Sequence, residues 1–237
     1  MTVNQASYLL KTRLVRLRYL VTMNKLTLVI DGSSSSTFVG LQGVDGKWLI
    51  QSSQKLAPLE GLFSMIEAMF DSTEYELTDI RSFVYCKGPG SVLGLRLCSM
   101  AIQTWGHLSK PVVQFFHYNS LELTAALLAL DEAEMDSALL ISDWKKDVWH
   151  AIEIRTGQMK TITTIDDQAV RTWNKGPLFY LPQRKGWQTI PTDAITVEYS
   201  PHRLIEVTHL LKETKNIELY ASNINRFQKW VPQYHRA

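Results

Sequence analysis

Residues 80–108 read IRSFVYCKGPGSVLGLRLCSMAIQTWGHL, and their order of residue types predicts the fold of the first half of the chain. The β-branched and aromatic run Ile80–Cys86 is typical of a strand. Gly88-Pro89-Gly90 then favours a tight turn, because glycine and proline adopt backbone angles that other residues avoid. Ser91 is suited to cap a following helix by accepting a backbone N–H bond two or three residues on. We therefore expect a strand, a tight turn and a helix in this order.

The helix that begins after Ser91 is apolar nearly all the way round. Its apolar residues are Val92, Leu93, Leu95, Leu97, Cys98, Met100, Ala101, Ile102 and Trp105. A helix that packs on a single core needs only one apolar stripe. We therefore expect this helix to be buried on two sides, by its own sheet and by a partner.

The residues before and after this unit continue the pattern of an α/β protein. Apolar periodicity predicts strands at Leu26–Asp31, Ser36–Gly43 and Lys47–Ser53, with a hairpin turn at Asp45-Gly46, and a helix from Pro58 to about Phe70. A strand at Val112–Phe116 and a helix at Ser120–Leu130, capped by Asn119 and Glu122, complete the first series. Strands followed by strand–helix crossovers in this order are typical of a ribonuclease-H-like half-domain.

The second half begins again with strands, so the sequence predicts a duplicated, two-lobe architecture. The expected elements are strands at Ala138–Ser142, Val148–Ile154, Met159–Thr163 and Leu178–Leu181, helices near Asp166–Trp173 and Pro201–Glu213, a hairpin turn at Thr156-Gly157, and a strand or tail at Ile217–Ala221. The predicted fold class is α/β, with two ribonuclease-H-like lobes. We predict a poorly ordered extension at 1–22, an N-terminal lobe at 23–118, and a smaller C-terminal lobe with its tail at 119–237.

Charge and composition exclude some classes of protein. Of 237 residues, 45% are hydrophobic, which is ordinary for a globular protein. Residues 1–22 hold four of the 25 basic residues and no acid, so the remainder has 21 basic and 23 acidic residues and no nucleic-acid signature. No segment approaches the length of a membrane span. Cys86 and Cys98 are not spaced as a redox pair, which indicates buried thiols in the cytoplasm.

The most suggestive chemical motif is the hydroxyl-rich turn after the first strand, Asp31-Gly32-Ser33-Ser34-Ser35-Ser36-Thr37. In actin-like ATPases and sugar kinases, such a turn holds nucleotide phosphate with backbone N–H groups. An ordinary polar turn, in which the serines bond to the backbone, explains the same residues. The matching segment of the second half, Ser142–Lys146, lacks the glycine that a second phosphate loop needs. Asp31 and Ser33 are therefore weak cofactor candidates, and we expect no bound cofactor.

Other kinds of site have less support. Gly88-Pro89-Gly90-Ser91 is suited either to anion binding at a helix N-terminus or simply to shaping and capping the chain, and we favour the second interpretation. The six histidines form no metal-binding spacing, so neither a metal site nor a metal-dependent peptidase is expected. No nucleophile elbow is present. Basic and aromatic residues alternate in 220–237, a pattern that suits RNA contact or packing on the body of the protein.

Three segments resemble one bacterial family. The first segment, LTLVIDGSSSS, resembles the opening LAIDTS of the family. The second, KGPGSVLGLRLCSMAIQTWGHLSKPVV, resembles the family signature GPGSFTGLRIG…AKGLA…IPVV. The third, ALLISDWKKDVWHAIEI, resembles the later family segment ALIDARRGEVYAA. The family is TsaB, also called YeaZ, the non-catalytic paralogue of the tRNA threonylcarbamoyl transferase TsaD. The resemblance spans about Met23 to Glu213. The chain departs from the pattern at Gly32 (usually Thr), at Val92-Leu93 (Phe-Thr), at Leu56-Ala57-Pro58 (Glu-His-Ser) and at Asp143–Asp147.

The resemblance implies an α/β, actin-like (ASKHA) fold, in which two ribonuclease-H-like lobes have mixed β-sheets. It also implies a scaffold, not an enzyme, in the synthesis of N6-threonylcarbamoyladenosine (t6A) at position 37 of tRNA. The implied partners are a TsaD-like transferase, a TsaE-like ATPase through the complex, and a second copy of the chain, with tRNA reached only indirectly and no membrane. We place the partner interface at the turn and the two first-lobe helices: Gly88, Pro89, Gly90, Ser91, Leu93, Gly94, Arg96, Leu97, Met100, Ile102, Leu62, Ile66 and Met69. The rival hypothesis is an actin-like ATP-dependent phosphotransferase that uses Asp31-Gly32-Ser33.

Overall fold

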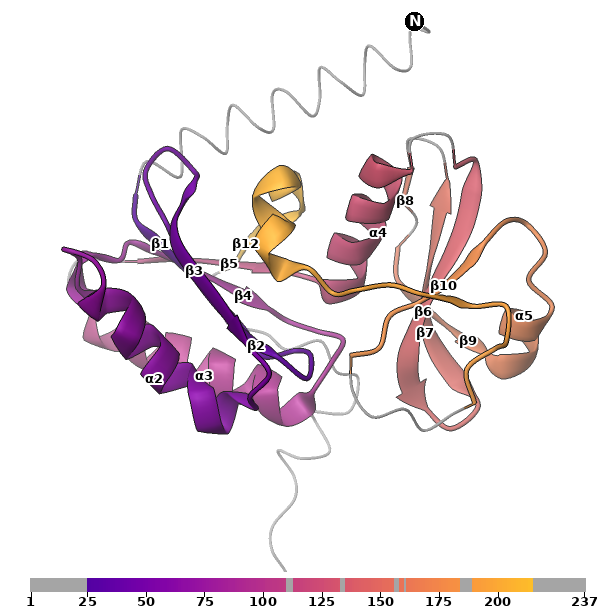
Figure 1. The fold of residues 1–237 in the computed structure, drawn as a ribbon, viewed down its shortest axis with the longest axis horizontal. Helices are drawn as coiled ribbons and strands as arrows, with labels where there is room; N and C mark the ends of the chain where they lie inside the picture. The colour runs from indigo at the N-terminus through magenta and orange to yellow at the C-terminus, as the bar shows by residue number, and fades with distance from the viewer. Residues whose placement is uncertain are drawn as a thin grey trace, which may run out of the picture.

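Two six-stranded mixed sheets with helices against them make up the part of the chain that the structure describes (Figure 1). The structure is a computed structural model, and it describes residues 25–109, 113–132, 135–155, 158–159, 161–183 and 189–214. The predictions for 1–22, for the turn at Thr156-Gly157, and for 217–237 lie outside these residues.

The first lobe follows the predicted order of elements closely. Its elements are β1 (Thr27–Asp31), β2 (Thr37–Gln42), β3 (Trp48–Gln54), α2 (Pro58–Asp71), the 3-10 turn η1 (Leu77–Asp79), β4 (Ser82–Cys86), α3 (Val92–Leu108) and β5 (Gln114–Tyr118). The strands β1, β2 and β3 form an antiparallel meander, whereas β4 and β5 join β1 in parallel. The predicted strands and helices of this lobe are confirmed to within two residues.

The second lobe repeats this plan in shortened form. Its elements are α4 (Ser120–Asp131), β6 (Ser137–Lys145), β7 (Val148–Arg155), β8 (Gln158–Met159), β9 (Thr163–Asp166), α5 (Asp167–Arg171), β10 (Leu178–Tyr180) and β11 (Ile195–Thr196). As β1 pairs antiparallel with β2 and parallel with β4, so β6 pairs antiparallel with β7 and parallel with β10. The topology confirms the predicted α/β fold of two ribonuclease-H-like lobes.

The chain then returns to the first lobe, and here the sequence-based prediction was wrong. Two 3-10 turns, η2 (Pro201–Glu206) and η3 (Thr208–Leu210), replace the predicted helix, and β12 (Lys212–Thr214) pairs antiparallel with β5. Figure 1 shows this segment, in orange and yellow, crossing from the second lobe to lie beside α4. Strand β12 therefore belongs to the first sheet, although its residues fall within the range that we predicted for the second lobe.

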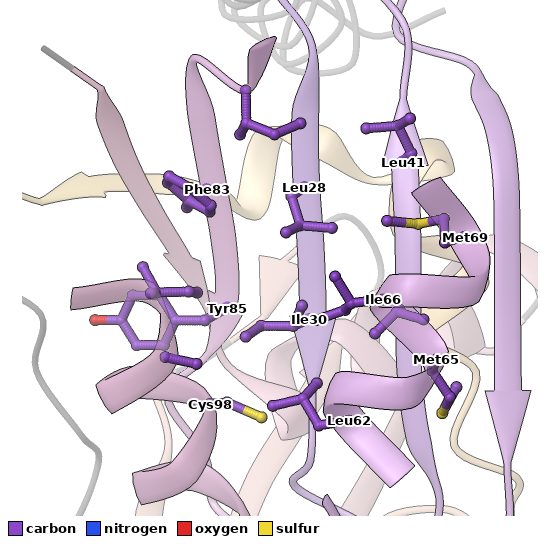
Figure 2. Packing of buried hydrophobic residues seen from close by; sticks show 14 of the residues in the cluster. Leu28, Ile30, Leu41, Leu62, Met65, Ile66, Met69, Phe83, Tyr85 and Cys98 are labelled. Atoms are coloured by element: carbon purple, nitrogen blue, oxygen red, sulfur yellow. The ribbon is translucent and has the colours of Figure 1, made fainter. Parts of the chain in front are cut away.

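Helices α2 and α3 lie on the same face of the first sheet, and a core fills the space between them and the strands. Leu28 and Ile30 from β1 meet Leu62 and Ile66 from α2 in this core (Figure 2). From α3, Cys98 points into the same cluster. The opposite face of the sheet packs against α4 and η2, in a second core that joins the two lobes.

Candidate functional site

Asp31, at the end of β1, is the buried carboxylate of the candidate nucleotide turn. Its side chain is 1% exposed. One carboxylate oxygen, Oδ1, accepts the backbone N–H of Ser33 at 2.7 Å, as expected for a polar turn. The other, Oδ2, accepts the hydroxyl of Tyr199 at 2.5 Å and also the hydroxyl of Tyr118. The carboxylate is thus bonded on both oxygens by groups of this chain.

The two tyrosines stay protonated and therefore remain donors. Burial, followed by the negative charge of Asp31, raises the pKa of Tyr118 and Tyr199 well above the ordinary value. The same two causes raise the pKa of the Cys86 thiol, whose sulfur lies 3.7 Å from the Tyr199 hydroxyl. A thiol attacks as its thiolate, so a buried thiol with a raised pKa is a poor nucleophile.

The first two residues after Asp31 pack closely against α3 and the turn that precedes it. A Cβ atom at Gly94 would lie 2.0 Å from the carbonyl oxygen of Gly32. Helix α3 can therefore lie this close to the turn only because position 94 is a glycine. A Cβ atom at Gly90 would lie 2.2 Å from the carbonyl oxygen of Ser33, and the N–H of Ser91 donates to that same oxygen at 2.7 Å. These contacts occupy the carbonyl groups of Gly32 and Ser33, whereas further along the turn Ser34 and Ser36 are half-buried and Ser35 is exposed.

Two of the departures from the family pattern contact each other at this turn. Gly32 stands where the family usually has threonine, and Pro58 begins α2 where the family pattern has a different sequence. A Cβ atom built at Gly32 would lie 2.4 Å from Cγ of Pro58. The proline ring therefore occupies the space that a larger residue at position 32 would need.

The matching turn of the second lobe is not a phosphate loop. Residues 142–145 remain in β6, and Asp147, with φ of 59°, leads directly into β7. Asp143 is buried and accepts the hydroxyl of Tyr180 at 2.5 Å. A hairpin this tight leaves no loop long enough to surround a phosphate.

The turn Gly88-Pro89-Gly90-Ser91 is held within the chain, as the capping interpretation predicts. Its Gly88-Pro89 peptide bond is cis. The Ser120 side chain at the start of α4 donates to the carbonyl of Pro89 at 2.6 Å, and Ser91 Oγ accepts the N–H of Gly94 at 3.3 Å. Gly88 and Pro89 are buried. The turn therefore fixes the start of α3 between the Asp31 turn and α4.

The described residues include neither a group suited to hold a metal ion nor a helix suited to cross a membrane. Across these ranges, no three His, Cys, Asp or Glu side chains are grouped so that they could hold a metal ion. None of the described helices has the length and apolar character needed to cross a membrane.

The outer side of α2 and α3 carries large apolar side chains. Leu59 (68% exposed) and Phe63 (52%) lie one turn apart on α2, and Leu93 (64%), Met100 (62%) and Leu108 (73%) follow helical spacing on α3. We call these five residues the α2/α3 strip. The edge of the Phe63 ring meets Trp105 of α3, with ring centroids 6.3 Å apart, so the two helices meet at the strip. A contiguous exposed apolar patch marks an interaction site more often than scattered residues do.

Burial corrects part of the predicted interface. Leu62, Ile66, Met69 and Ile102 are 0–6% exposed because they pack into the core beneath the helices, so they offer no surface to a partner. Gly88, Pro89 and Gly94 are buried as well, whereas Gly90, Ser91, Arg96 and Leu97 are half-buried. Of the predicted interface residues, Leu93 and Met100 are the most exposed. Helix α3 is buried on one side by its own chain, and its other side is exposed.

The sequence-based prediction missed four residues that shape these two regions. Leu59 and Phe63 follow the apolar period that predicted α2, but they were not among the predicted interface residues. The sequence also offered no signal for Tyr118 or Tyr199 as partners of Asp31, since Tyr199 lies 168 positions from Asp31. The sequence held one hint of an outward face on α2. Leu59 and Phe63 lie one helical turn apart, and the acidic residue Glu60 is next to Leu59.

Comparison with known proteins gives a fold. No family model matches the chain, and no curated protein matches it. Among solved structures, YeaZ from Pseudomonas aeruginosa is 17% identical over 66% of this chain and 75% of its own, with a TM-score of 0.52. An uncharacterized protein with similarity to peptidase YeaZ from Pseudomonas aeruginosa is 15% identical over 83% of this chain and 99% of its own, with a TM-score of 0.58. In its fold, the chain is therefore a YeaZ-like, two-lobe α/β protein.

Proposed function

We propose that the chain is a non-catalytic scaffold subunit for t6A modification of tRNA, and that it binds a TsaD-like transferase through the α2/α3 strip. The observation that carries the proposal is the strip itself, which lies on α2 and on α3, the helix that contains the GLR part of the GPGS…GLR motif. The YeaZ-like fold supports it. In this role the protein works in the cytoplasm, reaches a TsaE-like ATPase through the complex, and contacts tRNA only indirectly.

The state of the Asp31 turn favours a scaffold over the rival phosphotransferase. Tyr118 and Tyr199 bond the carboxylate, and α3 packs against the carbonyl of Gly32. We expect calorimetry of the isolated protein with ATP and magnesium to detect no tight binding. Tight binding that Asp31→Ala abolishes would instead support the phosphotransferase.

The scaffold proposal is tested by co-purification with a TsaD-like protein from the same host. Leu93→Asp and Met100→Asp place a charge on the strip, and we expect each to weaken the complex at least about tenfold, since desolvating an unpaired charge in an apolar interface is costly. Leu130→Asp is the matched control, because Leu130 is also exposed (54%) but lies on α4. Circular dichroism confirms that each variant is folded.

Light scattering separates the possible occupants of the strip. A heterodimer that the strip variants disrupt and the control leaves intact supports the proposal. A homodimer that forms instead, and that the same variants disrupt, assigns the surface to a second copy of the chain. A complex with normal affinity in both strip variants would refute the assignment of this face.

A further inference from the structure

The outer surface of α2 is apolar near its start and acidic further along. Leu59 and Phe63, the α2 part of the α2/α3 strip, are 68% and 52% exposed. Residues 56–80 contain six acidic and no basic residues, and all six acidic side chains are exposed: Glu60, Glu67, Asp71, Glu74, Glu76 and Asp79. Five of these six follow Phe63 in the sequence. This surface therefore fits a binding partner that is apolar at one end and basic at the other.

Residues 8–21, which read YLLKTRLVRLRYLV, have the complementary pattern in their sequence. We call them the N-terminal segment. They begin with three apolar or aromatic residues, and the basic residues that follow are Lys11, Arg13, Arg16 and Arg18. Apolar residues recur at the period of a helix stripe, at Leu10, Leu14, Leu17 and Val21. The sequence therefore predicts an amphipathic helix with basic flanks and no acidic residue.

The point where the described part of the chain begins determines how this segment reaches α2. Met69, near the end of α2, lies beside Leu41 in the core (Figure 2), and Leu41 is the register partner of Leu28 in β1. The later half of α2 therefore lies over the beginning of β1, close to Lys25. Leu17 is eight positions before Lys25, and eight extended residues span up to about 26 Å, enough to pass a helix about 10 Å wide. This tether places the basic end of the segment near the acidic end of α2.

We propose that the N-terminal segment docks as an amphipathic helix on the outer side of α2 of its own chain. Its apolar start covers Leu59 and Phe63, and its arginines lie opposite Glu67 and Asp71, one and two helical turns after Phe63. Burial of apolar area supplies most of the affinity, whereas the opposite charges fix the direction and register of the helix. The docked segment covers part of the α2/α3 strip and so competes with a partner that binds there. This competition rests on the proposed function, but the docking does not.

Crosslinking in the full chain tests the docking directly. Leu14→Cys and Ser64→Cys are introduced together and treated with a short bismaleimide, since Ser64 is exposed on α2 and cysteine keeps position 14 apolar. The native Cys86 and Cys98 are buried and should not react. Leu14→Cys with Leu130→Cys, on α4, is the matched control. We expect the crosslink to Ser64→Cys to form within one chain at least about tenfold faster than the control, because docking raises the local concentration. Equal rates, or a product found only as a crosslinked dimer, would overturn the proposal.

Charge reversal makes the test specific. Arg16→Glu with Arg18→Glu should slow the crosslink about fivefold, because two attractions become repulsions. Arg16→Lys with Arg18→Lys keeps the charge and serves as the control. Adding Glu67→Lys and Asp71→Lys to the reversed chain should restore the rate, since the charge pairs are then inverted. A reversed chain that these two substitutions do not rescue would refute the assigned contact.

The competition has a separate measurement, the affinity for a TsaD-like protein. Arg16→Glu with Arg18→Glu should tighten this complex about threefold, since it frees the chains whose strip is covered. Unchanged affinity for a partner whose binding still needs Leu93 would overturn the competition. A normal crosslink in a chain that forms no such complex would contradict the scaffold proposal and support the docking alone. Sedimentation of the full chain with anionic lipid vesicles, together with no crosslink to Ser64→Cys, would assign the segment to a membrane surface and overturn the docking.

Discussion

Both sides of helix α3 carry large apolar side chains, but only one side is covered by the chain itself. The inner side, with Gly94, Cys98 and Ile102, packs against β1, β4 and α2 with almost no exposure. The outer side also carries large apolar side chains, Leu93 and Met100, which are more than half exposed beside the polar Gln103 and Thr104. Burial within the chain accounts for the first set and leaves the second without a covering element in the described residues. Hydrophobic character alone therefore indicates that a residue needs burial, and only its position shows which molecule buries it.

The contrast is tested most strongly by placing the same charge on each side. Ile102→Asp buries an unpaired carboxylate in the core and should destabilise the fold by at least about 4 kcal/mol. Met100→Asp, two positions earlier on the exposed side, should change stability by no more than about 0.5 kcal/mol. Urea unfolding followed by circular dichroism measures both. Similar unfolding midpoints would contradict the assigned faces of α3.

The close approach of α3 to the Asp31 turn predicts the next largest effect. Gly94→Ala should destabilise the protein by about 2 kcal/mol, because the added methyl group meets the carbonyl of Gly32 and this overpacking exceeds the helix propensity gained from alanine. The control is Ser64→Ala, on the exposed side of α2. A glycine such as Gly46 would not serve, because its positive φ would strain an alanine there. Thermal unfolding gives the comparison, and a Gly94→Ala protein as stable as the wild type would show that the contact yields easily.

The polar bonds at Asp31 predict a smaller effect that depends on pH. Tyr199→Phe removes one donor to the buried carboxylate and should cost about 1.5 kcal/mol at neutral pH. Because the pKa of Tyr118 and Tyr199 is raised in the folded state, their contribution is fully present below about pH 10, the ordinary tyrosine value, and is lost as the pH rises further. The wild type should lose stability more steeply in alkali than the Phe variant. Identical pH profiles would argue against the bonds.

The smallest expected effect on stability comes from the outer side alone. Leu93→Ser should leave the free energy of unfolding within about 0.5 kcal/mol of the wild type, since the side chain is already in water. It should also reduce association of the isolated protein at high concentration, as light scattering can measure. A loss of several degrees in melting temperature would mean that Leu93 packs within its own chain.

Local signals in the sequence predicted most of the fold. The cap at Asn119, whose Oδ1 accepts the N–H of Leu121 at 2.9 Å, and the turn at Gly46 depend on residues a few positions apart. The C-terminal segment shows the limit of such signals. Its apolar spacing favoured a helix, but residues 212–214 pair with β5, and a bond between Lys212 and Glu122 spans 90 positions. Pairing at that distance outweighed local helix propensity, which is a weak preference.

The candidate sites divide in the same way. From its residues alone, the sequence determined that a strand, a tight turn and an apolar helix follow one another at 80–108, because the turn and the cap depend on adjacent residues. Only the tertiary structure decided that Tyr118 and Tyr199 bond Asp31 and that Leu93 rather than Ile102 is exposed. The bonds to Asp31 depend on contacts between segments far apart in the chain. The exposure of Leu93 depends on which side of α3 the core covers, and apolar spacing cannot specify that side when apolar residues occur all round the helix.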